Sequence, residues 1–154
     1  MLNWLFRRHS QHATIVPPFQ HGESLTLDWD EDCEGWTSAL PELGRGAKIY
    51  IGPRAGVEHP QSASCTLVVQ ARERILSLND AALSYLVRES GAFVEDTYKH
   101  SLSSASFTPT GLEIFEHEGT LGEYALTYDP AFDPGAIWRV RFRQQQPAEW
   151  GFDS

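Results

Sequence analysis

The sequence predicts an α+β protein, in which an antiparallel β-sheet of about six to seven strands has a helical segment packed on one of its faces. Three segments with the alternating pattern of β-strands precede one segment of helical periodicity, and four more follow it. Strands grouped in this way favour antiparallel pairing over β-α-β repetition. With 154 residues, the chain is long enough for one hydrophobic core. We expect a single domain over residues 21–154 after an N-terminal tail, residues 1–20.

The first strand is expected at residues 24–29. Leu25, Leu27 and Trp29 alternate there with polar residues, as in a strand with one buried face. Two further strands are expected at residues 35–40 and 47–52.

Residues 62–90 show the spacing of one helix face, because apolar residues recur at intervals of three and four. We expect the helix to break at Asn79 and Asp80, with Asp80 as the N-cap of a second helix, and to stop at Gly91. For residues 65–69 a short apolar strand is the alternative. The periodic residues are Val68, Ala71, Ile75, Leu78, Ala82 and Leu86.

The C-terminal part has the pattern of a hairpin followed by two strands. Residues 112–118 and 123–129 flank a glycine-bounded link. Alternation returns at residues 137–142, and a last strand is expected around Trp150 and Phe152.

The charge is concentrated in two segments. The chain has 21 acidic and 12 basic residues, a net charge of -9. Residues 23–34 and residues 113–133 hold six acids each and no Lys or Arg, so the remainder is mildly basic. This balance excludes a phosphate-neutralising surface and therefore nucleic acid, and it favours a basic protein partner.

If the sheet brings the two segments together, they form an acidic, partner-binding face with aromatic edges. If they lie on opposite edges, they serve solubility alone. The residues expected on the face are Asp30, Glu31, Asp32, Glu34, Trp36, Glu116, Glu118 and Glu123.

A second candidate site uses Asp129 and Asp133 as paired carboxylates with arginines from the next strand. Arg139, Arg141 and Arg143 alternate, so they share one strand face and could hold a phosphate or carboxylate. We favour simpler interpretations: each aspartate precedes a proline and builds a turn, and the arginines pair with residues on neighbouring strands. A hydrolase or ligand site requires both aspartates and Arg139 or Arg141 in one pocket.

No cofactor or metal site is expected. Glu113 and His117 would point to one face of a strand, whereas Glu116 and Glu118 would point to the other, so they do not converge on one ion. No motif of a nucleophilic enzyme surrounds the serines of residues 101–106.

We expect a cytoplasmic protein without membrane insertion. Two cysteines without ligand spacing indicate reduced thiols. The short apolar run at residues 1–6 precedes Arg7 and Arg8, the reverse of a secretory signal.

Two stretches carry a resemblance to known proteins: YALTYDPAFDPGAIWRVRF…EWGFD, within residues 124–153, and LSLNDAALSYL, at residues 76–86. They resemble small bacterial sheet-and-helix domains, some of which are immunity proteins of toxin–immunity pairs. The resemblance implies a binding protein without catalytic residues, whose partner is a toxin or effector domain. The sequence therefore predicts a cytosolic immunity protein that neutralises a cognate toxin through its acidic face.

Overall fold

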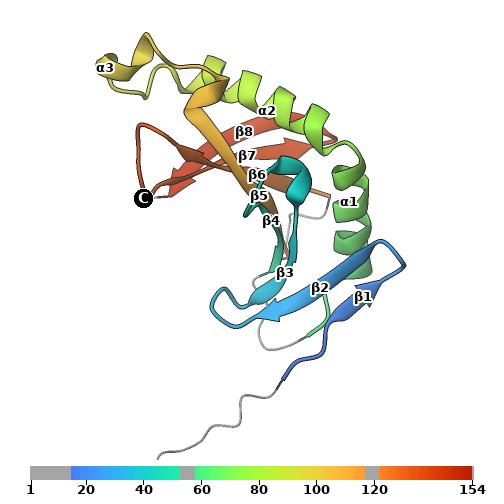
Figure 1. Cartoon of the computed structure of the whole chain (residues 1–154). Helices are drawn as coiled ribbons and strands as arrows, with labels where there is room; N and C mark the ends of the chain where they lie inside the picture. The colour runs from blue at the N-terminus through green and yellow to red at the C-terminus, as the bar shows by residue number, and fades with distance from the viewer. Residues whose placement is uncertain (1–14, 53–57, 117–121, 154) are drawn as a thin grey trace, which may run out of the picture.

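The computed structural model describes residues 15–52, 58–116 and 122–153. Figure 1 shows an open, curved sheet with helices α1 and α2 along one side of it. The elements in chain order are β1 (Phe19–His21), β2 (Leu25–Asp30), β3 (Gly35–Ala39), the 3-10 helix η1 (Pro41–Leu43), β4 (Lys48–Gly52), α1 (Ser62–Glu73), α2 (Ile75–Ser90), α3 (Asp96–Lys99), the 3-10 helix η2 (Ser104–Ser106), β5 (Phe107–Phe115), β6 (Tyr124–Pro130), β7 (Ile137–Arg143) and β8 (Gln146–Asp153).

The eight strands lie in the sheet in the same order as in the chain, from β1 to β8. Every neighbouring pair is antiparallel except β4 and β5, which are parallel. A parallel pair needs a long crossover, and α1 and α2 provide it. The predicted α+β class is confirmed, with eight strands instead of six to seven.

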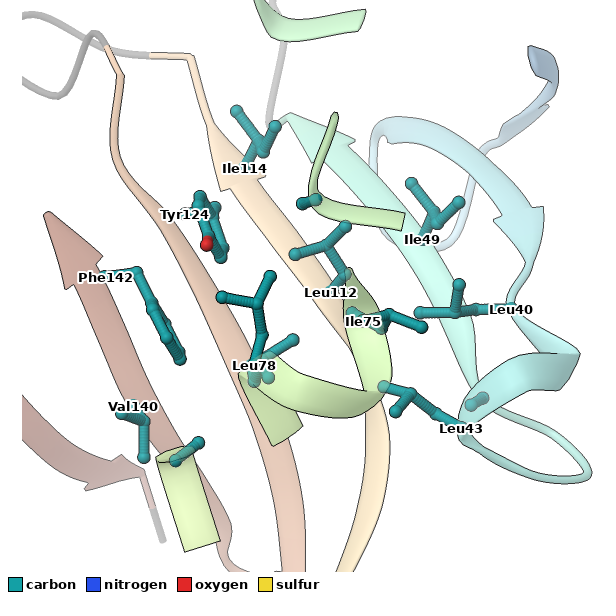
Figure 2. Close-up of a cluster of buried hydrophobic side chains, with 14 of the residues drawn as sticks. Leu40, Leu43, Ile49, Ile75, Leu78, Leu112, Ile114, Tyr124, Val140 and Phe142 are labelled. Carbon is teal, nitrogen blue, oxygen red and sulfur yellow. The ribbon is translucent and has the colours of Figure 1, made fainter. Parts of the chain in front are cut away.

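The core lies between the sheet and the two main helices. Figure 2 shows sheet residues such as Ile49, Leu112 and Phe142 gathered around Ile75 and Leu78 of α2. All five are buried. The alternation of apolar residues along β2, β4 and β7 thus sets which face the helices cover.

The helical segment breaks at Arg74, five residues before the predicted position. Arg74 leaves the α region, with φ -119° and ψ 12°, and its N–H donates to Ala71 O at 3.1 Å. Asn79 lies within α2, where its Oδ1 accepts the Tyr128 hydroxyl at 3.0 Å, so the prediction of Asp80 as an N-cap is wrong. Residues 65–69 are helical, and α2 ends at Ser90 with Gly91 as its C-cap, as predicted.

The segment predicted as a tail, residues 1–20, contains the first two residues of strand β1. Phe19 pairs with Leu27 and His21 pairs with Leu25, so β1 extends the sheet beyond β2. Phe19 also contacts the Trp36 ring at 5.9 Å between centroids. A three-residue strand directly after Pro17 and Pro18 is too short to show alternation in the sequence.

Candidate functional site

The face of the sheet opposite α1 and α2, here called the open face, carries the arginines of β7. On this face, residues that are paired in register from strand to strand form one row across seven neighbouring strands. Its residues, from β2 to β8, are Asp28, Thr37, Tyr50, Glu113, Ala125, Arg141 and Glu149. The row has acids at both ends, an aromatic residue at β4 and arginine at β7.

Arg139 joins three strands of the open face. Its Nε donates to Glu113 Oε2 of β5 at 2.7 Å, and its Nη1 donates to Asp153 of β8. It reaches Glu113 across β6, where the facing residues Ala125 and Thr127 have short side chains. Burial alone would lower the pKa of Arg139, but the hydrogen bonds and charges of Glu113 and Asp153 outweigh it and raise the pKa.

The other two arginines of β7 are also paired. Arg141 donates to Glu149 of β8. Arg143 donates to Glu123 at 2.8 Å and to Glu149 at 3.3 Å. The expectation that the arginines form ion pairs within the sheet is confirmed, although Glu113 lies two strands away instead of one.

A hollow of about 410 Å³ opens over this end of the open face. Arg139, Arg141 and Phe115 line it together with the acids of β8, and neither Asp129 nor Asp133 is on its wall. The structure therefore does not bring the two aspartates into one pocket with the arginines. Sequence reasoning missed Glu149 and Asp153, although they alternate in β8 as the arginines alternate in β7.

Asp133 lies in the turn that joins β6 to β7, whereas Asp129 lies within β6, where it pairs with Thr108. The Asp133 N–H donates to Pro130 O at 3.2 Å, and the Ala136 N–H donates to Asp133 O at 3.2 Å. Oδ2 of Asp133 accepts a long hydrogen bond from Trp138 Nε1 at 3.4 Å. The turn-building interpretation is confirmed for Asp133.

The end of the first acidic segment forms the turn between β2 and β3. This turn is here called the acidic hairpin and is defined by Asp30, Glu31, Asp32 and Glu34. Asp30 Oδ1 accepts the Asp32 N–H at 3.1 Å, and Glu34 adopts a positive φ of 50°. Glu31, Asp32 and Glu34 are exposed. Within residues 15–52, 58–116 and 122–153, no Lys or Arg forms an ion pair with any of the four.

Tyr50 connects the acidic hairpin to the rest of the open face. Its side chain lies over Gly35 and Gly52. A Cβ added at Gly35 would come within 2.3 Å of the ring, and one added at Gly52 within 2.8 Å of the hydroxyl oxygen, so only glycine leaves room. Its hydroxyl donates to Cys33 O at 3.0 Å. Sequence reasoning did not select Tyr50, because its position beside the acidic hairpin follows from the pairing of β3 with β4 and not from the pattern of its own strand.

The pKa of Tyr50 is raised by burial first and by nearby negative groups second. Burial, followed by the nearby groups Cys33, Glu113, Glu34 and Asp30, raises it to about 12. Asp30 and Glu34 belong to the first acidic segment and Glu113 to the second. Tyr50 is paired in register with Glu113 and its hydroxyl donates to Cys33 O, so the two segments approach each other at β4.

The other residues predicted for the binding face are buried, already hydrogen-bonded or outside the described residues. Trp36 is fully buried and donates from Nε1 to Glu58 O at 2.7 Å, so its placement on a binding face is wrong. Glu116 Oε1 accepts the Gln61 N–H at 2.7 Å, and Glu123 is paired with Arg143. Glu118 lies outside the described residues.

Among the described residues, no three His, Cys, Asp or Glu side chains are grouped closely enough to hold a metal ion. None of the described helices is long and apolar enough to cross a membrane. Comparison of the chain with protein-family models, curated proteins and solved structures finds no match.

Proposed function

We propose that this protein is a cytosolic immunity protein, which binds a bacterial toxin and neutralises it by covering a basic surface at the toxin's active site. The observation that carries the proposal is the acidic hairpin. Its four carboxylates occupy one turn without a described cationic partner, whereas Glu113 and Glu123 of the second segment are paired with arginines. The binding face is therefore narrower than the sequence predicted.

The electrostatics of the hairpin support a basic partner. Its carboxylates lie within about one Debye length of each other, roughly 8–10 Å, so they repel one another in the free protein. A partner with Lys or Arg side chains relieves this repulsion when it binds, and the field of the hairpin speeds the encounter.

Tyr50 provides an aromatic centre beside the charges. It lies half-buried on the open face, and its hydroxyl is held by the hairpin backbone at Cys33. Tyrosine in a rigid position is a frequent source of binding energy at protein interfaces. We place the contact on the hairpin and Tyr50, with Asp28 at its border.

The test is charge reversal with a matched control. Glu31→Lys with Asp32→Lys changes the hairpin by four charge units, and Glu73→Lys with Glu89→Lys makes the same change near the C-terminal ends of α1 and α2. A lysine in those last turns is compatible with the helix dipole.

Each variant is co-expressed with the product of the adjacent gene, and co-purification, association rate and host growth are measured. We expect the hairpin variant to lose about 10–100-fold in affinity, mostly in association rate, and to lose protection of the host. The control variant keeps both. A complex that survives hairpin reversal at the control's affinity would contradict the proposal.

A further inference from the structure

Strand β8 ends the sheet and exposes apolar surface. It has a neighbouring strand on one side only within the described part of the chain, and Figure 1 shows it beside α2. The Tyr85 hydroxyl of α2 donates to Ala148 O at 3.2 Å, which holds the strand in place. A long, ordered edge strand is a template for pairing with another strand.

The face of β8 toward the helices carries a row of stacked aromatic rings. Trp138 of β7 stacks on Trp150 at 4.9 Å and on Phe152 at 5.5 Å between centroids. Phe93 packs on Trp150 edge to face at 5.2 Å. Phe93 is 71% exposed and Phe152 is 50% exposed. The rings are fixed by one another but leave much of their area in water.

Only the second half of β8 has a free backbone edge suited to pairing. Pro147 has no N–H, and the register shifts opposite Phe142, where Pro147 pairs. Residues 149–153 lie beyond this irregularity. Any added strand is therefore confined to about five residues.

We propose that a second copy of this chain occupies this edge, with the two β8 strands antiparallel about a two-fold axis at Gly151. The pleat requires facing residues to point to the same side of the sheet, so the axis passes through a residue. An axis at Trp150 would bring Pro147 into the pairing, and an axis at Phe152 would shorten the paired segment. At Gly151 the pairing covers residues 149–153 and sets Trp150 against the second copy's Phe152, twice.

The same pairing sets two like charges of the open face against each other. Glu149 lies opposite the second copy's Asp153, and both carboxylates already pair within their own chain, with Arg141 and Arg139 respectively. Gly151 adds no side chain at the axis, and nothing lies within 4 Å of where its Cβ would be. The two acids therefore meet as members of ion pairs, not as isolated like charges.

The dimer should be weak and reversible. Phe93 and Phe152 of two copies leave roughly 500 Å² exposed, a fraction of the area of a standard interface. We expect a dissociation constant on the order of 10–100 µM. Because each chain carries a net charge of -9, added salt should strengthen association by screening long-range repulsion.

The first experiment measures molecular mass by sedimentation equilibrium from about 1 to 500 µM, a range set by that expected affinity. The average mass of the wild-type chain should rise from 17.3 kDa toward twice that mass. Phe152→Lys should weaken dimerisation at least tenfold, whereas Leu76→Lys, at a 62% exposed apolar residue of α2, should leave it unchanged. A wild-type monomer throughout the range, or equal effects of both variants, overturns the proposal.

The second experiment reads the register. Because Cys33 is exposed, the variants are made in a Cys33→Ser background. Gly151→Cys should form a disulfide-linked dimer under mild oxidation, since facing Cα atoms across an antiparallel pair are about 4.5–5.5 Å apart. Ala148→Cys has no equivalent facing it and should stay monomeric. Cross-linking of Ala148→Cys in preference to Gly151→Cys overturns the pairing.

Discussion

Replacement of Arg139 tests whether the ion pairs of the open face hold the sheet together. The Arg139 and Glu113 side chains are only 22% and 18% exposed, and their pair joins β7 to β5 across β6. An exposed pair contributes about 0–1 kcal/mol, and breaking a buried one costs about 3–5 kcal/mol. For this half-buried pair we expect Arg139→Met to lower the free energy of unfolding by about 2 kcal/mol. Arg141→Met is the control, because Arg141 and Glu149 are each 44% exposed, and it should cost less than about 1 kcal/mol.

The measurement is urea denaturation followed by tryptophan fluorescence, with Glu113→Gln and the double variant to complete a thermodynamic cycle. About 2 kcal/mol corresponds to a fall of roughly 4–8 °C in Tm for a chain of this length. We expect a coupling energy between Arg139 and Glu113 of about 1 kcal/mol. Coupling below about 0.3 kcal/mol, or equal losses for Arg139→Met and Arg141→Met, would show that the pair does not stabilise the sheet.

Three further predictions concern glycine, aromatic and titrating positions. Gly111→Ala should cost about 1–3 kcal/mol by thermal unfolding, because its Cβ would lie 2.4 Å from Lys48 O, whereas Gly151→Ala meets nothing within 4 Å and should cost less than about 1 kcal/mol. Trp36→Phe should lower stability by about 1–3 kcal/mol and leave partner affinity unchanged, since the indole is buried in the core; a selective loss of binding would return Trp36 to the interface. The pKa of Tyr50 is raised from 10.0 to about 12, so the folded state holds this proton more tightly than the unfolded state. The urea midpoint of unfolding should therefore fall as pH rises from 10 toward 12. Tyr50→Phe should reduce that fall, and a pH profile identical to that of the wild type would refute the assignment.

Periodicity predicted the elements that have a buried face, but it did not predict how they pair. The alternation of apolar residues predicted β2, β4 and β7 because each of these strands has one face in the core. The parallel pairing of β4 with β5 depends on the path of the crossover, which strand patterns do not encode. The break at Arg74 was missed for a similar reason, since Asn79 is held inside α2 by Tyr128, a contact 49 positions away in the chain.

The candidate site was partly predictable because a run of acidic residues can be seen in the sequence. Which of these acids form ion pairs depends on distant strands and cannot be seen there. The acidic hairpin is one continuous segment and was visible as such. Glu113 and Glu123 looked equivalent to it, yet they lie within reach of arginines from a strand that follows later in the chain. Trp36 was assigned to the face as an aromatic residue at its edge, but its side chain is buried in the core.

The two proposed contacts lie at opposite ends of one sheet, which determines how they combine. The acidic hairpin joins β2 and β3, and the dimer contact is at β8, six strand positions from β2. With strands about 4.8 Å apart, the hairpin and the two-fold axis are separated by roughly 30 Å measured along the curved sheet, and the two hairpins of a dimer by roughly 60 Å along the same path. Each hairpin then remains open to its own partner, so the dimer should bind two toxin molecules independently. Phe152→Lys should accordingly change the complex from two copies of each protein to one of each without changing the affinity per site, and a loss of affinity in that variant would mean that toxin and second copy compete for one surface.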